Sequence, residues 1–242
     1  MASVKEVHFF DRQYEKGLDH YETFFSAYDG QPAVGESTPD YLHGEWTEND
    51  VPALIHRHLP NVRLIASLRN PVDRAYSRYL NATAKQKGGS LISFEEKLVQ
   101  SSEFIREGFY YEQIQRYLTY FPRKQLLLLL FDDLQADAPG FMRKICEFLE
   151  IRPQFPETVL SVNINAAAGK QNLGKSRALW LLAKAFSNFG FRTVGDRVRR
   201  LNSVEISPMS RETRYKLIDT YRESNLKLQE FLGRDLSHWN RP

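Results

Sequence analysis

The amino-acid sequence predicts an α/β fold built on a parallel β-sheet, and three observations lead to this class. Residues 62–68 (VRLIASL) and 126–131 (LLLLLF) are apolar at nearly every position, as parallel strands covered on both faces are. Helical spacing of apolar residues separates these two runs. Alternation of strand, helix and strand implies right-handed crossovers and a parallel sheet. Because 242 residues suffice for one domain with a full core, we expect a single domain over residues 1–242.

The helices follow from apolar spacing and from the residues at their ends. One helix is predicted over residues 14–27, in an otherwise loop-rich start, and it stops near Asp29-Gly30. Asp50 stands where it would cap a short helix that runs to His58. Ser93 and Glu96 have the spacing of a capping box. Further helices are predicted over residues 71–84, 93–100, 110–121, 140–149, 176–188 and 210–232, and an exposed loop over residues 163–175.

Composition and charge exclude several classes of protein. A formal charge of +3 is too small for a general nucleic-acid binder. Cys146 is the only cysteine, so no intrachain disulfide can form, and its apolar neighbours predict a buried structural thiol. The start of the chain has no signal-peptide pattern, and the longest apolar run is too short to cross a bilayer. A soluble, cytoplasmic protein without a membrane segment is therefore expected.

The segment RNPVDRAYS, residues 69–77, is predicted to bind an anion. It follows the first apolar run directly, so Arg69 would stand at the carboxyl end of a strand. Pro71 suits the first turn of a helix, whose free N–H groups would point outward. Ser77 follows about two helical turns after Arg69 and would share a phosphate with it where the chain folds back. The alternative interpretation pairs Arg69 with Asp73 or with a helix C-terminus and leaves Ser77 facing solvent.

Four ordered segments resemble a known family, the sulfotransferases that use 3′-phosphoadenosine 5′-phosphosulfate, in particular the heparan-sulfate-type and related bacterial members. They are KEVHFFD (residues 5–11), GESTPDYL (35–42), LRNPVDRAYSRY (68–79) and GFYYEQIQRYLTYFPRKQLLLLLFDDL (108–134). The tail, residues 210–239, is similar to the closing helix of the family. The resemblance implies a three-layer, P-loop-NTPase-like parallel sheet flanked by helices. It also implies an enzyme that needs no metal and releases 3′,5′-adenosine bisphosphate.

The resemblance assigns roles to particular residues. Arg69 and Ser77 match the pair that binds the 3′-phosphate of the donor, which suits an arginine fork and a hydroxyl. Glu36 matches the general base that takes the proton of the acceptor. The alternative for Glu36 is an exposed turn residue. Ser37 stands where several animal members have a lysine, so a second cation is not expected there.

Other residues are weaker candidates for the same site. Lys5 and His8 lie in a block that is near the acceptor in relatives, so they are candidate contacts with a saccharide or small-molecule acceptor. Alternatively, Phe9 and Phe10 anchor this block in the core and His8 packs beside them. Lys175 and Arg177 lie where relatives close over the donor.

One part of the family pattern is not found in the sequence. The family begins with a strand, a phosphate-binding loop and a helix, and no such loop occurs in these residues, so this first unit is expected to be missing. Two interpretations follow: a truncated sulfotransferase, or a non-catalytic remnant that binds a nucleotide or an anionic glycan. A third interpretation, a nucleotide kinase, would require a phosphate loop and magnesium ligands, and neither is seen in the sequence. The acceptor and the oligomeric state stay open.

Overall fold

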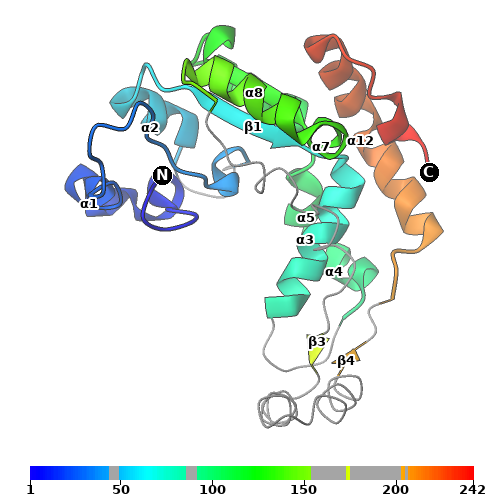
Figure 1. Ribbon diagram of the computed structural model, residues 1–242. Coiled ribbons are helices and arrows are strands. Elements are labelled where there is room, and N and C mark those ends of the chain that lie inside the picture. The colour runs from blue at the N-terminus through cyan, green and yellow to red at the C-terminus, as the bar shows by residue number, and fades with distance from the viewer. Residues whose placement is uncertain (44–48, 86–91, 154–172, 175–202, 205–206) are drawn as a thin grey trace, which may run out of the picture. The chain divides into compact units, whose positions relative to one another are not determined.

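The computed structural model describes residues 1–43, 49–85, 92–153, 173–174, 203–204 and 207–242 (Figure 1). The chain divides into two compact units that are interleaved in sequence. The first unit comprises Met1–Arg69, Phe109–Val162 and Ser224–Leu236, and the second comprises Asn70–Gly108, Asn163–Glu223 and Ser237–Pro242. A single domain over the whole chain stays a prediction. The helix predicted over 176–188 and the loop predicted over 163–175 lie outside the described residues, except for Leu173–Gly174, which form a strand.

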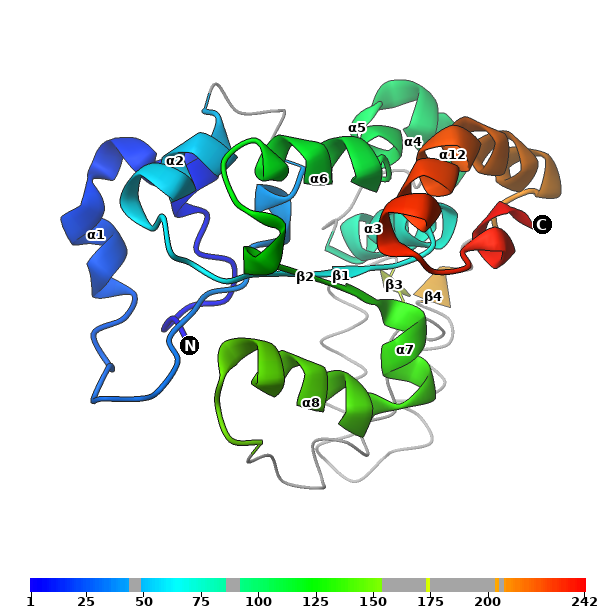
Figure 2. The same ribbon diagram turned by 90° about the horizontal axis from the view of Figure 1, so that it is seen from above.

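The first unit contains a pair of parallel strands, β1 (Leu64–Leu68) and β2 (Leu126–Leu130). They pair in register from Leu64 with Leu126 to Leu68 with Leu130, which confirms the predicted parallel pairing. Figure 2 shows helix α8 on one side of this pair and helices α2 and α6 on the other, which gives three layers. Their bounds are Val51–His58 for α2, Tyr110–Leu118 for α6, Phe131–Ala136 for α7 and Ala138–Leu149 for α8.

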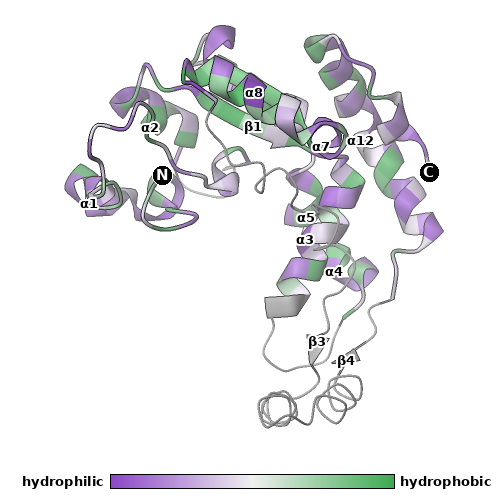
Figure 3. Ribbon diagram, in the orientation of Figure 1, coloured by the Kyte–Doolittle hydropathy of each residue, from purple (hydrophilic) through white to green (hydrophobic). Residues whose placement is uncertain are grey.

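Strand β1 is less covered than its apolar sequence predicts. Figure 3 shows β1 as a largely hydrophobic strand beside the mixed surface of α8. Leu68 is fully buried, but Ile65 is 40% exposed, so coverage on both faces is not found for β1 in the described structure. Cys146 on α8 is buried, as predicted. No helix within the described ranges has both the length and the apolar composition needed to cross a bilayer.

The amino-terminal part of the first unit has shorter helices than the sequence predicts. Its elements are η1 (Phe9–Gln13), η2 (Tyr14–Lys16), α1 (Leu18–Thr23) and η3 (Pro39–Tyr41). The helix predicted over 14–27 is divided at Gly17, whose φ of 81° lies in the left-handed region that glycine tolerates. Asp50 precedes α2 but does not cap it with its side chain. Instead Asp50 accepts a hydrogen bond from the Tyr120 hydroxyl at 2.7 Å.

The described part of the second unit is mainly helical. Helix α3 spans Pro71–Lys85, α4 spans Phe94–Gln100 and α5 spans Glu103–Arg106. The capping box of Ser93 and Glu96 is formed as predicted. Strands β3 (Leu173–Gly174) and β4 (Ser203–Val204) pair antiparallel, and η6 spans Ser237–Asn240. Helix α12 (Arg211–Leu232) begins in this unit and continues into the residues assigned to the first one.

Candidate active site

Glu36, the predicted general base, is the centre of a hydroxyl cluster in the first unit. Its Oε1 accepts hydrogen bonds from the hydroxyls of Tyr21 at 2.9 Å and Tyr41 at 3.2 Å. Its Oε2 accepts one from Thr38 Oγ1 at 2.7 Å. Burial, and then the Glu36 charge, raise the pKa values of Tyr21 and Tyr41 well above the ordinary value for tyrosine. Both phenols therefore stay protonated as donors, and both carboxylate oxygens of Glu36 are engaged.

The segment with Lys5 and His8 reaches the same cluster through its backbone. The His8 N–H donates to Thr38 Oγ1 at 3.4 Å, and the Phe9 N–H donates to the Tyr41 hydroxyl at 2.9 Å. The structure thus brings His8 and Glu36 together, linked through Thr38, although they are far apart in sequence. Phe9 and Phe10 are buried, as the core-anchor interpretation predicts. Lys5, by contrast, is 85% exposed and lies 3.8 Å from a Glu6 oxygen.

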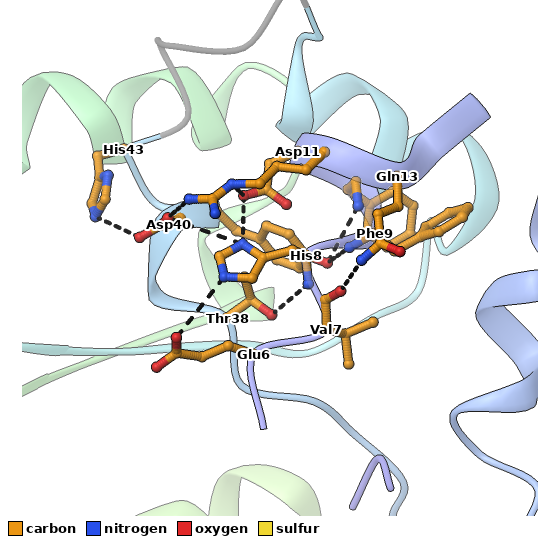
Figure 4. A network of polar contacts seen from close by, with 12 residues as sticks. Glu6, Val7, His8, Phe9, Asp11, Gln13, Thr38, Asp40 and His43 are labelled. Carbon is orange, nitrogen blue, oxygen red and sulfur yellow. Dashed lines mark hydrogen bonds and ion pairs between the residues drawn. The ribbon is translucent and has the colours of Figure 1, made fainter. Parts of the chain in front are cut away.

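His8 forms a close pair with a carboxylate that sequence reasoning did not single out. Its Nδ1 lies 2.8 Å from Asp11 Oδ2, and the Asp11 side chain is almost wholly buried (Figure 4). Nε2 of His8 lies on the other side of the ring, 3.9 Å from Glu6 Oε2. An imidazole held at one nitrogen by a carboxylate keeps a fixed orientation and leaves the other nitrogen available. An acidic residue three positions after a histidine was the sequence signal for this pair.

The backbone around His8 is strained. Glu6 has a φ of 60° and His8 a φ of 53°, which are left-handed values that non-glycine residues adopt rarely. Such strain persists only where the surroundings impose it, and it is concentrated at functional sites. Here the buried neighbours Val7 and Phe9 fix the chain, so that Glu6 and His8 are held on its less buried side. Glu6, with a side chain 39% exposed, is thereby added to the candidate site.

His8 and Asp11 also belong to a cluster of possible metal ligands, although the sequence shows none at ligand spacing. Ligand atoms of His8, Asp11 and Asp40 lie within 4.8 Å of one another. The cluster arises because the fold joins two distant segments, which spacing alone does not show. Arg12, however, forms a short ion pair with Asp40 and lies 3.5 Å from Asp11, so a guanidinium already neutralises these carboxylates. The carboxylates of this cluster therefore suit the guanidinium that they bind better than they suit a metal ion.

Arg69 stands at the carboxyl end of β1, as predicted. Its Cζ lies 5.2 Å from the ring centroid of Phe131, the residue that follows β2. Arg69 forms no hydrogen bond or ion pair with any residue that the structure describes, so neither the pairing with Asp73 nor the pairing with a helix C-terminus is found among these residues. Asp73 pairs instead with Arg214 at 2.6 Å. The guanidinium of Arg69 is held, yet its donors are available.

The first turn of α3 differs from the prediction of free N–H groups. The Asn70 side chain accepts hydrogen bonds from the N–H groups of Val72 at 3.0 Å and Asp73 at 3.4 Å. Pro71 has no N–H, and the Arg74 N–H donates to the Asn70 carbonyl. The prediction is therefore wrong for this turn, because the residue between Arg69 and Pro71 acts as a cap. An anion near α3 must be bound by side chains.

Ser77 is half-buried on α3, in the second unit, whereas Arg69 belongs to the first. The pairing of these two residues on one phosphate stays a prediction. Lys175 and Arg177 lie outside the described residues, so their proposed role is equally untested.

Comparisons with known proteins assign the family. The family model described as the sulfotransferase domain matches residues 2–170. The chain is 32% identical to human heparan sulfate glucosamine 3-O-sulfotransferase 6 over 160 residues, which cover 62% of this chain and 45% of that protein. It is 27% identical to human heparan sulfate glucosamine 3-O-sulfotransferase 3B1 over 238 residues, 95% of this chain and 56% of the relative. The chain thus spans about half the length of these curated relatives.

A solved structure supports the fold. The crystal structure of a sulfotransferase from Alicyclobacillus acidocaldarius matches with a TM-score of 0.70 and 22% identity, over 99% of this chain and 87% of that one. This likeness confirms the predicted α/β class. Together with the match of the family model over residues 2–170, the ordered sequence blocks lead to one conclusion: the chain belongs to the sulfotransferase domain family.

Proposed function

We propose that this protein transfers a sulfuryl group from 3′-phosphoadenosine 5′-phosphosulfate to a hydroxyl or amine of a saccharide or small-molecule acceptor. In this reaction the acceptor oxygen or nitrogen bonds to sulfur as the bond from sulfur to the 5′-phosphate oxygen breaks. The acceptor proton passes to a carboxylate, and 3′,5′-adenosine bisphosphate leaves. The observation that carries the proposal is the family match across residues 2–170, which include Glu36, Arg69 and Ser77. The names of the curated relatives favour a saccharide acceptor.

The donor is proposed to bind through Arg69 and Ser77. Arg69 supports this role because no carboxylate of the described residues occupies its guanidinium. A planar guanidinium binds two phosphate oxygens at once, and a serine hydroxyl adds a further donor. Lys175 and Arg177 are proposed as additional contacts with the donor. The chemistry assigned to these residues requires no metal.

Two carboxylates compete for the role of general base. The sequence predicts Glu36, and this assignment stays a prediction. Three hydroxyls already donate to Glu36, so its main contribution in the structure is to hold Tyr21 and Tyr41 in place. Glu6 accepts no such set of hydroxyls, is partly exposed and lies beside the oriented imidazole of His8. A base must reach the proton that it removes, so these contacts favour Glu6, with His8 and Lys5 as contacts to the acceptor.

Turnover with sulfur-labelled donor and a panel of saccharide acceptors tests the activity. Labelled product supports the proposal. Binding of 3′,5′-adenosine bisphosphate without turnover would instead support the alternative, a non-catalytic nucleotide- or glycan-binding protein. If calorimetry detects no binding of this nucleotide, the assignment of 3′-phosphoadenosine 5′-phosphosulfate as the donor is wrong as well.

Glu6→Gln and Glu36→Gln separate the two candidates for the base. Loss of a general base costs about 10²–10⁴ in rate, so Glu6→Gln is expected to reduce kcat by this factor without unfolding the protein. Glu36→Gln is expected to lower the melting temperature, because three hydroxyl donors lose a charged acceptor. Tyr21→Phe is the matched control, since it removes one of these donors and no carboxylate. The reverse pattern would return the role to Glu36.

A further inference from the structure

The two residues that follow the paired strands lie in contact at the carboxyl edge of the sheet. Leu68 and Leu130 form the last pair of β1 and β2. Arg69 and Phe131 are therefore the next residues at the same edge, on strands about 4.8 Å apart. Phe131 also begins α7, and the guanidinium of Arg69 lies over its ring, with 5.2 Å from Cζ to the centroid.

An aromatic ring holds an arginine differently from a carboxylate. The negative face of the ring attracts the guanidinium but accepts none of its directional hydrogen bonds. The five N–H donors of the guanidinium lie in its plane, and they stay available for a planar ligand such as phosphate. Arg69 has no ion-pair partner among the described residues, and the ring of Phe131 is what its guanidinium contacts there.

Phe131 does not have the burial expected of a residue that serves only the core. The preceding strand residues Leu129 and Leu130 are 3% and 2% exposed, whereas Phe131 is only half-buried. A large apolar ring at the carboxyl edge of parallel strands, where such sheets bind their ligands, has a position suited to supporting a binding residue.

We propose that Phe131 is a positioning residue, which holds the guanidinium of Arg69 so that its N–H donors face the 3′-phosphate of the donor nucleotide. The inference rests on the proposed function, because it takes Arg69 as the contact of that phosphate. It predicts that the ring contributes to recognition of the 3′-phosphate and not to binding of the rest of the nucleotide.

Two nucleotides that differ only in this phosphate test the inference. Calorimetry measures the affinities of 3′,5′-adenosine bisphosphate and adenosine 5′-monophosphate for the unsubstituted protein and for Phe131→Leu. Cation–π contacts of this kind affect affinity by about three- to thirtyfold. Phe131→Leu is expected to weaken binding of the bisphosphate by that factor and to leave the monophosphate unchanged. Phe131→Tyr, which keeps an aromatic face, is expected to retain the affinity of the unsubstituted protein.

A matched pair elsewhere in the same unit serves as the control. Arg123 lies over the ring of Phe231 at 5.5 Å, so Phe231→Leu removes a similar contact away from the carboxyl ends of the strands. It is expected to change neither affinity. In an Arg69→Ala background, Phe131→Leu is expected to have no further effect on the bisphosphate, because the ring acts through that arginine.

The outcomes separate the inference from the function on which it rests. Equal weakening of both nucleotides in Phe131→Leu, or no weakening of either, would overturn the inference and leave the donor site intact. If the unsubstituted protein does not distinguish the two nucleotides, the assignment of Arg69 to the 3′-phosphate is wrong and the inference falls with it. Should Phe131→Leu fail to fold, Phe131→Met, whose flexible apolar side chain adapts to the space without an aromatic face, gives the same comparison.

Discussion

Arg69 and the neighbouring arginines Arg74 and Arg78 have opposite surroundings. Arg69 rests on an aromatic ring and has no carboxylate partner among the described residues. Arg74 and Arg78 both form short ion pairs with Glu107, a carboxylate that is 1% exposed. Arg74 also donates to the Phe104 carbonyl at 2.6 Å. Arg69 and Arg74 are thus only five positions apart in the sequence. Arg69 keeps its hydrogen-bond donors available, whereas the donors of Arg74 hold α3 against α5.

This difference shows how one residue type serves two purposes. A buried carboxylate must be neutralised, because its desolvation is costly. Glu107 therefore fixes both guanidiniums, and they serve the fold. A ring does not consume hydrogen-bond donors, so Arg69 is kept in place for a ligand. Removing Arg69 should therefore affect nucleotide affinity and leave stability nearly unchanged, whereas removing the charge of Glu107 should affect stability.

The largest expected effect is the loss of donor binding in Arg69→Ala. Two charge-assisted hydrogen bonds to a phosphate, at about 1.5 kcal/mol each, correspond to roughly a hundredfold loss of affinity for 3′,5′-adenosine bisphosphate. The free energy of unfolding should change by less than about 1 kcal/mol, because only the contact with the ring is lost. Calorimetry and urea unfolding measure the two quantities. Arg57→Ala, at an exposed arginine of α2, is the control, and equal effects of both variants on affinity would contradict the comparison.

Glu107→Gln should show the converse, a loss of stability. Removing one partner of a buried ion pair costs about 3–5 kcal/mol, and we expect the lower value because the two guanidiniums keep some contact with water. Urea unfolding measures the change. Glu103→Gln is the matched control, since Glu103 is 47% exposed and lies 3.7 Å from the same Arg78. If Glu107→Gln is as stable as this control, the conclusion that Arg74 and Arg78 stabilise the fold through Glu107 is wrong.

Gly108→Ala tests whether packing, and not charge alone, fixes the segment beside α3. A Cβ at this position would lie 2.6 Å from a Tyr221 ring atom and 2.9 Å from Pro71 Cβ. Overpacking of this kind costs about 1–3 kcal/mol. The melting temperature should fall while the ion pairs of Glu107 are unaltered. An unchanged melting temperature would mean that the ring of Tyr221 moves freely.

The smallest expected effect concerns an arginine paired with a carboxylate at the surface. Arg234 binds both oxygens of Asp133, at 2.5 and 2.8 Å, and this contact lowers the pKa of Asp133 below its ordinary 3.8. A carboxyl group whose pKa is lowered on folding stabilises the folded state at pH values above its ordinary pKa. This stability is lost as the pH falls through the lowered pKa. Asp133→Asn should therefore cost at most about 1 kcal/mol at neutral pH, and less at a pH of about 3. Urea unfolding at both pH values measures this difference, and a larger cost in acid would contradict the assignment.

Several elements could be predicted from the sequence because their signals are local. The apolar runs predicted β1 and β2, and Ser93 with Glu96 predicted a capping box that is formed. The helix predicted over 14–27 was too long, because apolar spacing continued past Gly17 while the backbone there turned. Asp50 was predicted as a side-chain cap, but Tyr120 competes for its carboxylate.

The candidate site was predicted only in part, for a related reason. The sequence placed Arg69 at a strand end and His8 beside core aromatics, since both statements depend on neighbouring residues. It did not predict the pairing of His8 with Asp11, nor the hydroxyls around Glu36. Asn70 was not predicted as a cap, because Pro71 is by itself a sufficient signal for the start of a helix.

By itself, the sequence determined the α/β class, the parallel strand pair and the family of this protein, since apolar periodicity and ordered blocks are properties of the chain alone. Only the tertiary structure decided which charges are free. Whether an arginine meets a ring, as Arg69 does, or a buried carboxylate, as Arg74 does, depends on residues distant in sequence that the register of β1 with β2 and the packing of α3 on α5 bring together. Electrostatic interactions decline steeply with distance and solvent exposure, and the sequence specifies neither.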